Sequence, residues 1–165
     1  MSIFVAMSDR IPITKPGYEA IKAELKKLMT LDRPAIQRAI AEARAHGDLK
    51  ENAEYHAAKE RQGFIEGRIQ ELNAKIPNFQ VIVPSDNRAG SVVFGARVTL
   101  ENLETGETLN YFIVGPDEAD LKRQQISVQS PIAKALIGKQ VGDVVTVAIP
   151  RGQIEVEITG VDYES

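Results

Sequence analysis

The chain has 165 residues, of which 43% are hydrophobic and 26% are charged, and these proportions are close to the averages for soluble globular domains. They argue against intrinsic disorder and fibrous architectures, and the absence of cysteine excludes a disulfide scaffold, thiolate zinc sites and a cysteine nucleophile. The net charge of -3 is not that of a free-standing nucleic-acid binder, so any contact with nucleic acid must be local.

The N-terminal residues do not resemble a targeting segment. Residues 1–7 contain one short apolar run with no charged segment before it and no cleavage-like site, so they are too short for a signal peptide. No stretch of the chain approaches the roughly 18 apolar residues of a membrane span. We therefore expect residues 1–12 to form a partly disordered extension. We also expect the protein to be cytoplasmic and to make no contact with a membrane.

Residues 15–76 carry the apolar period of α-helices. Thr14 can cap the first helix, and Pro16 suits its first turn. Pro34 lacks a backbone N–H, so we expect a distortion at residues 31–34 that kinks the helix or shifts its register without necessarily ending it. The first apolar stripe consists of Tyr18, Ile21, Leu25 and Leu28, and then of Ile36, Ala39, Ile40 and Ala43.

A second stripe repeats with alternating spacings of three and four residues, which is a heptad seam with one polar member. Its members are Tyr55, Ala58, Gln62, Ile65, Ile69, Leu72 and Ile76. Between the stripes, Gly47 suits a left-handed C-terminal cap and Asp48 suits the cap of the next helix. Folding the chain there brings Leu28 opposite Leu72. We therefore expect an antiparallel coiled-coil hairpin domain over residues 13–83, about 45 to 50 Å long, and a monomer because the seam is satisfied internally.

After Pro77 the apolar period drops to two, which is typical of half-buried strands. The alternating runs lie at residues 92–94, 98–100, 109–113, 145–149 and 154–158. One short helix is expected at residues 131–137, before Gly138. Residues 84–90, rich in Ser, Asp, Asn and Gly, are the expected linker. Residues 91–165 thus predict a small antiparallel sheet packed on one helix, and the whole chain predicts an α+β fold.

The charge differs between the two halves. Residues 15–76 contain 12 basic and 10 acidic residues, whereas residues 77–165 contain 7 basic and 12 acidic ones. This difference suggests that the halves meet different surfaces. The alternative is that long solvated helices simply carry many charges of both signs.

Asp48 and Glu51 are three residues apart at an expected helix start, which brings both carboxylates near the same exposed end. In one interpretation they form a capping box that satisfies free N–H groups of the helix. In the other they are ligands of a divalent metal. Mg²⁺ typically takes one or two carboxylates together with phosphate oxygens and keeps several waters, so this pair cannot make a tight site alone. It would have to be inserted into the active site of another protein.

Other catalytic patterns are missing from the sequence. His46 and His56 flank the acidic pair, but their spacing fits no helical zinc motif, and we interpret them as surface or packing residues. No P-loop, dinucleotide fingerprint or nucleophile elbow is found. We therefore expect no enzyme that is complete within this chain.

Residues 41–56, AEARAHGDLKENAEYH, resemble the coiled-coil tip of the Gre family of bacterial transcript cleavage factors. Residues 117–120, DEAD, and residues 126–138 are similar to the C-terminal domain of that family, which has an FKBP-like fold. The resemblance covers about residues 13–163. Lys50, His56 and the near-neutral hairpin resemble the GreA type of this family more than the more basic GreB type.

In that family the hairpin enters the secondary channel of a backtracked RNA polymerase, and carboxylates at the tip help to hold a second Mg²⁺ and to activate a water. The polymerase then cuts its own nascent RNA and resumes from a new 3′ end. The matching residues here are Asp48 and Glu51. The resemblance therefore implies an accessory factor that holds no cofactor in isolation and shares Mg²⁺ with the polymerase. Two-metal chemistry agrees, because extra carboxylates recruit a weakly held ion.

The resemblance implies further roles around the tip and in the second half. Residues that orient the acidic pair or contact RNA would be Lys50, Asn52 and Tyr55. Basic residues that touch the nascent RNA would be Arg44 and Lys59. Residues that dock on the coiled coil at the rim of the polymerase channel would be Ser130, Pro131 and Ile132. For the tip residues the alternative is an exposed helix position, and for Pro131 it is ordinary helix initiation.

Three other functions stay open at this point. A related factor could enter the same channel and inhibit the polymerase, although such paralogues look altered at the acidic tip, and this tip is unaltered. A peptidyl-prolyl isomerase is suggested only by the FKBP-like second half, which has few of the aromatic residues that line such a pocket. The third is a structural hairpin module in which Asp48 and Glu51 only cap a helix.

Overall fold

The computed structural model describes residues 10–47, 52–84 and 90–163. Contacts divide the chain into two compact units. The hairpin unit runs from Glu19 to Asn78, and the sheet unit contains the residues up to Tyr18 and those from Phe79 onward. The domain boundaries that the sequence suggests at residues 83 and 91 stay a prediction, and the expected linker lies mostly outside the described residues.

The α+β class predicted from the sequence is confirmed. The helices of the hairpin are α2 (Lys15–Lys27), a π-helical segment (Leu28–Asp32), α3 (Arg33–Ala45) and α4 (Ala53–Lys75), followed by a 3-10 turn (Ile76–Asn78). The strands are β1 (Ile11–Ile13), β2 (Phe79–Val81), β3 (Ala96–Asn102), β4 (Thr108–Val114), β5 (Gln125–Ser127), β6 (Val144–Ile149) and β7 (Gly152–Tyr163). A 3-10 turn (Leu121–Arg123) and α5 (Pro131–Leu136) complete the sheet unit.

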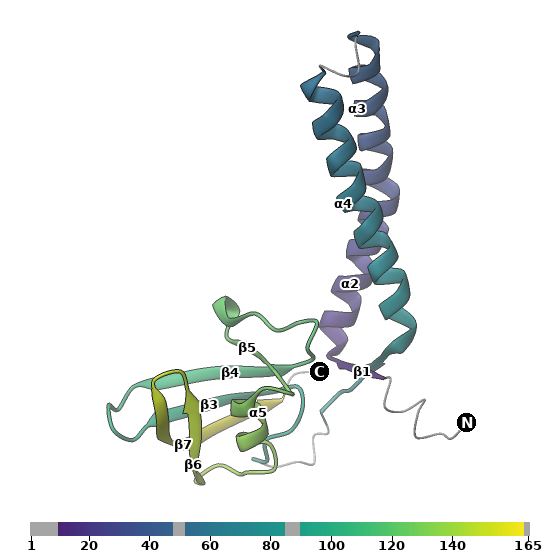
Figure 1. Ribbon diagram of the computed structural model, residues 1–165. Coiled ribbons are helices and arrows are strands. Elements are labelled where there is room, and N and C mark those ends of the chain that lie inside the picture. Colours follow the sequence, from purple (N-terminus) through teal and green to yellow (C-terminus); the bar gives the residue numbers. More distant parts are fainter. Residues whose placement is uncertain (1–9, 48–51, 85–89, 164–165) are drawn as a thin grey trace, which may run out of the picture. The chain divides into compact units, whose positions relative to one another are not determined.

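α3 and α4 run side by side in the hairpin unit (Figure 1). Every member of the predicted α4 seam is buried or half-buried, so the heptad prediction is confirmed. The antiparallel register is also confirmed, because Arg33 of α3 pairs with Glu66 of α4. Toward the tip the buried seam residues are the small Ala43 and Ala58, which let the two backbones approach closely.

The predicted distortion is present as the π-helical segment between α2 and α3. It begins a few residues before the expected position, because the ring of a proline clashes with the carbonyl four residues earlier, which for Pro34 belongs to Thr30. Two bidentate ion pairs flank the segment. Arg33 binds Glu66 through two contacts of 2.8 Å, and Arg68 binds Glu24 through contacts of 2.6 and 2.9 Å. These pairs tie α2 and α3 to α4 on both sides of the irregular turn.

The sheet unit contains a five-stranded sheet in the order β5-β4-β3-β7-β6 (Figure 1). The prediction of a purely antiparallel sheet is wrong in one respect, because β5 runs parallel to β4. The other neighbouring pairs are antiparallel. The predicted short helix is confirmed as α5, and its Ala133 and Leu136 are buried in the core formed with strands β3 to β7.

Residues 92–94 do not form the predicted strand. Val92 is fully buried in the sheet-unit core, but its backbone pairs with the loop after α5: Val92 N donates to Lys139 O at 2.8 Å, and Gly138 N donates to Val92 O at 2.9 Å. The short apolar run therefore predicted a buried residue correctly but predicted a strand that does not form. Apolar runs of this length do not specify the type of secondary structure.

A small parallel sheet, which the sequence did not predict, joins the two ends of the hairpin. β1 pairs with β2, with Ile11 opposite Phe79 and Ile13 opposite Val81. Ile11 and Pro12, assigned from the sequence to an N-terminal extension, therefore belong to a strand. Residues 1–9 of that extension lie outside the described residues.

Candidate functional site at the hairpin tip

The tip of the hairpin, residues 46–52, starts where α3 ends. His46 N donates to Ala43 O at 3.2 Å and closes the last turn of α3. Gly47 follows with a φ of 121°, a backbone conformation that residues with a Cβ rarely adopt. The predicted role of Gly47 in ending the helix is therefore confirmed.

Asn52 closes the tip by bonding to both helices. Its Nδ2 donates to Ala43 O of α3 at 2.6 Å, and its Oδ1 accepts from Tyr55 N of α4 at 3.0 Å. The second bond makes Asn52 the N-cap of α4. The prediction that Asp48 caps this helix is wrong, because α4 starts at Ala53, four residues later than a cap at Asp48 would place it.

Three side chains stack beside this closure. The Arg44 guanidinium lies 5.9 Å from the centre of the Tyr55 ring, within the range of a cation–π contact. The Tyr55 ring meets the His56 ring edge-on, with 5.5 Å between their centres. Tyr55 is half-buried, whereas Arg44 and His56 are exposed. The Tyr55 ring therefore contacts both neighbours, and the positive charge of Arg44 stays at the surface.

Lys59 lies one turn further along α4 and is exposed. Its Nζ donates to Gln62 Oε1 at 3.2 Å, a surface contact that a stronger ligand displaces easily. The structure thus brings Arg44, Asn52 and Tyr55 together and places Lys59 close behind them. Asp48, Lys50 and Glu51 lie outside the described residues, so their predicted roles stay predictions.

The predicted docking residues form the start of α5 in the sheet unit. Ser130 caps this helix, with its Oγ accepting from Ala133 N at 3.2 Å, and Pro131 is the first helical residue. Ile132 is half-buried against the sheet-unit core. The prediction that Pro131 initiates a helix is therefore confirmed, and the docking role of these residues stays a prediction.

Sequence reasoning missed two contributions to the tip. The carbonyl of Ala43 receives two hydrogen bonds, from Asn52 Nδ2 and from His46 N, and the His56 ring packs on Tyr55. The backbone of an alanine gives no signal in a sequence, whereas the adjacency of two aromatic rings at positions 55 and 56 was visible.

Within the described ranges, no three His, Cys, Asp or Glu side chains gather as metal ligands. Likewise, no helix in the described part of the chain is long and apolar enough to cross a membrane.

Comparison with known proteins extends over both units. The family model described as "Transcription elongation factor, N-terminal" matches residues 11–81, and the model described as "Transcription elongation factor, GreA/GreB, C-term" matches residues 87–163. The transcription elongation factor GreA of Thioalkalivibrio sulfidiphilus is 59% identical over 94% of this chain and 99% of its own length. That of Thermodesulfovibrio yellowstonii is 54% identical over 96% of this chain and 100% of its own length.

Among solved structures, the GreA factor homolog 1 protein of Thermus thermophilus is 27% identical, with 93% of this chain and 99% of that chain covered and a TM-score of 0.42. The two family models together span nearly the whole chain, and the relatives match it over nearly their entire lengths. The chain therefore belongs to the GreA/GreB family of transcription elongation factors and is of the GreA type.

Proposed function

We propose that this protein binds bacterial RNA polymerase, inserts the hairpin tip into the secondary channel of a backtracked complex, and stimulates the Mg²⁺-dependent cleavage that the polymerase performs on the 3′ end of its nascent RNA. The protein is then an accessory factor, and the endonuclease active site belongs to the polymerase. Membership of the family supports polymerase as the partner.

The cap of α4 is the observation that carries the proposal. If Asp48 and Glu51 served as the capping box of this helix, their presence in the sequence would need no further explanation. Asn52 performs that task instead, and it also closes the tip by bonding to Ala43. The acidic pair is therefore not required to start α4, and a role in chemistry accounts for two carboxylates between the hairpin helices.

The chemistry of the donor set fits a shared Mg²⁺ and does not fit a resident one. Two carboxylates fill only part of an octahedral shell, and phosphate oxygens of RNA and ligands of the polymerase would supply the rest. Bound there, Mg²⁺ would lower the pKa of a water and neutralise charge on the scissile phosphate. Asp48 and Glu51 would contribute the two carboxylates, and Lys50 would contribute a positive charge beside them.

The basic residues behind the tip suit contact with the nascent RNA. Arg44 and Lys59 are exposed, and a phosphate contact needs only a charge within reach. The Tyr55 ring restrains Arg44 from one side, so the guanidinium is partly oriented before RNA arrives. Ser130, Pro131 and Ile132 at the start of α5 are the proposed docking surface for the coiled coil at the channel rim.

The test uses a stalled, backtracked elongation complex with 3′-labelled RNA and Mg²⁺. The variant carries Asp48→Ala with Glu51→Ala, and the readout is the rate at which short labelled RNA is released. We expect the wild-type protein to accelerate release and the variant to lose about a hundredfold or more of that acceleration. Polymerase binding should persist, because the substituted side chains act at the chemical step.

A matched control removes two other carboxylates from the same part of the hairpin. Glu42 of α3 and Glu54 in the first turn of α4 are both exposed, and the double alanine variant should stimulate cleavage as the wild type does. If the wild-type protein binds polymerase and slows transcription without cleavage, it is a channel inhibitor. If it binds with no effect on cleavage or transcription, it is a structural module, and the proposal fails in both cases.

A further inference from the structure

The acidic run at residues 117–120 has no part in the proposed function, yet one of its carboxylates makes a contact between distant parts of the sequence. Glu118 lies in the turn after β4, and Thr14 lies 104 residues earlier, just before α2. Glu118 Oε2 accepts from Thr14 N at 3.0 Å, and Glu118 Oε1 accepts from the Thr14 hydroxyl. Both residues belong to the sheet unit.

The same carboxylate also holds its own turn. Gly115 N donates to Glu118 Oε2 at 2.9 Å, and Glu118 N donates back to Gly115 O at 3.0 Å. Thr14 in turn caps α2, because its Oγ1 accepts from Gly17 N at 3.1 Å. One carboxylate therefore accepts three hydrogen bonds and connects a turn of the sheet unit to the N-cap of α2. We call this set, Thr14, Gly17, Gly115 and Glu118, the Glu118 contact.

Two glycines make this close approach possible. A Cβ at Gly17 would lie 2.0 Å from Glu118 Oε1, and a Cβ at Gly115 would lie 2.0 Å from the carbonyl oxygen of Pro12. At Gly115 the obstacle is backbone, whereas at Gly17 a Cβ would force the Glu118 carboxylate out of its place. Gly17 also stands inside α2, where alanine would favour the helix by roughly 1 kcal/mol. A glycine at this position is thus unfavourable for the helix and necessary for the contact.

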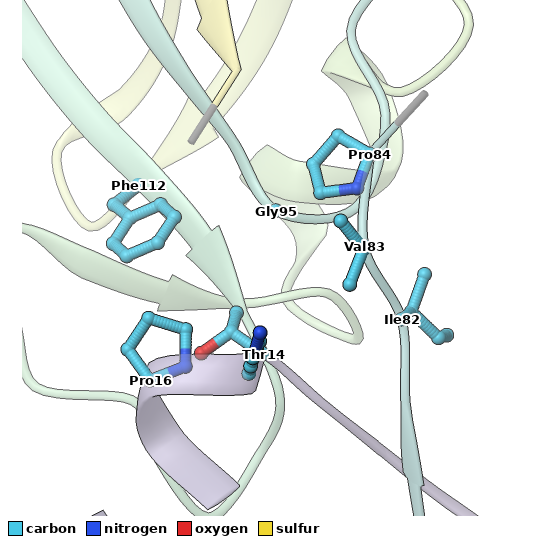
Figure 2. Close-up of a pocket in the computed structure, with 8 residues that line it drawn as sticks. Thr14, Pro16, Ile82, Val83, Pro84, Gly95 and Phe112 are labelled. Carbon is cyan, nitrogen blue, oxygen red and sulfur yellow. The ribbon is translucent and has the colours of Figure 1, made fainter. Parts of the chain in front are cut away.

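The surroundings exclude a ligand site at this place. Thr14 is only 4% exposed, and the adjoining cavity has a volume of about 10 Å³, room for no more than about one water. Figure 2 shows Thr14 and Pro16 at the start of α2, with Phe112 of β4 and Gly95 among the residues that line this cavity. The polar atoms of Thr14 are satisfied within the protein.

We propose that Glu118 is a positioning residue for the activity of the hairpin: by holding the N-cap of α2 to the turn after β4, it restrains the base of the hairpin in the free protein. α2 is a continuous helix from Lys15 to Lys27 that starts in the sheet unit and continues into the hairpin unit. A restrained base lowers the entropy that must be lost when the hairpin enters a narrow channel. This inference rests on the proposed function.

The first measurement is amide hydrogen exchange on the free protein. In Glu118→Ala, the amides of Thr14, Gly17 and Gly115 should exchange about tenfold faster or more. The amides of Thr14 and Gly115 lose the carboxylate that accepts from them. The amide of Gly17 keeps its acceptor, the Thr14 hydroxyl, but Glu118 no longer holds that hydroxyl in place. The amide of Ala133, bonded to Ser130 in α5, should not change. Glu101→Ala, which removes an exposed glutamate from β3, is the matched control. Unchanged exchange at Thr14 and Gly115 would overturn the proposal.

The second measurement is the dependence of RNA cleavage on the concentration of the protein. In Glu118→Ala, the half-saturating concentration should rise about three- to tenfold, whereas the rate at saturation should stay that of the wild type. A variant with Gly17→Ala should behave in the same way, because its Cβ occupies the place of the carboxylate while Glu118 itself remains. Thr14→Ser, which keeps the hydroxyl, should retain wild-type behaviour.

The possible outcomes separate this proposal from the proposed function. A lower rate at saturation would give Glu118 a part in the chemistry and overturn its positioning role. An unchanged cleavage curve despite faster exchange would show a local contact only and would also overturn it. If the wild-type protein stimulates no cleavage at all, the proposed function fails first, and the exchange data still decide whether the Glu118 contact exists.

Discussion

Glu24 and Arg68 show how one ion pair stabilises the hairpin unit. The two hydrogen bonds from Arg68 lower the pKa of Glu24, and partial burial opposes them without reversing the direction. A carboxyl whose pKa is lower in the folded state contributes stability that is fully present above its unfolded pKa, about 4.3, and is lost as the pH falls through the folded value. The Arg33 guanidinium lowers the pKa of Glu66 in the same way.

We therefore expect the free energy of unfolding to fall as the pH is lowered from about 5 to about 3. Glu24→Gln should be less stable than the wild type at neutral pH and should show a shallower fall over this range. Urea unfolding followed by helical circular dichroism at several pH values measures both effects. Glu42→Gln, at an exposed position of α3, should keep the wild-type slope. Equal slopes for Glu24→Gln and the wild type would contradict the expected role of the pair.

At the scale of elements, α4 contains two glycines that its packing does not require. A Cβ at Gly67 would meet nothing within 4 Å. Gly67→Ala should therefore stabilise the protein by about 0.5–1 kcal/mol, through better helix propensity and a less flexible unfolded chain. Urea unfolding at neutral pH is the measurement. Gly115→Ala is the opposite case, because its Cβ would collide with the Pro12 carbonyl, and it should destabilise. A destabilised Gly67→Ala would point to a contact on this face of α4.

The elements that were predicted well from the sequence are those in which the apolar pattern repeats several times. The heptad stripe of α4 and the alternation in β3, β4, β6 and β7 repeat often enough to specify both type and register. β1, β2 and β5 have three residues each, too few for a pattern. The strand predicted at residues 92–94 does not form, because the backbone of Val92 bonds to the loop after α5. An apolar run alone does not show which partner its backbone groups take.

The sequence predicted where the tip of the hairpin lies but not which residue caps α4. The turn at Gly47 and the half-buried Tyr55 follow from local signals, but Asp48 and Asn52 are equally good caps, and the sequence does not rank them. The contact of Glu118 with Thr14 joins residues 104 positions apart and leaves no local pattern. In the sequence, the acidic run around Glu118 is distinctive only through its resemblance to a known family.

Across the whole molecule, buried apolar residues are distributed unequally. The sheet unit has a continuous core to which α5 and the five strands β3 to β7 contribute buried side chains. In the hairpin, the buried cluster around Ile36, Ile40 and Ala58 is much smaller. Large-to-small substitutions in the sheet unit should therefore meet the full penalty of a cavity.

Leu136 is the clearest position for this test, because it is fully buried in α5 against the sheet. Leu136→Ala should lower the free energy of unfolding by about 2–5 kcal/mol. Leu121→Ala removes the same atoms from a side chain that is 79% exposed and should change stability by no more than about 0.5 kcal/mol. Guanidinium unfolding of both variants gives the comparison. Similar losses in the two variants would contradict the expected difference between a buried and an exposed leucine.

The pairing of β1 with β2 also has a consequence for how this chain could have changed during evolution. The residues that enter and leave the hairpin are neighbouring strands, separated by about 4.8 Å. The hairpin is thus a loop of chain that departs from and returns to one place in the sheet unit, as an inserted domain does. Equal numbers of residues added to or removed from α3 and α4, in whole heptads, would leave this junction and the seam register intact. The length of the hairpin could therefore change during evolution without a change in the fold of either unit.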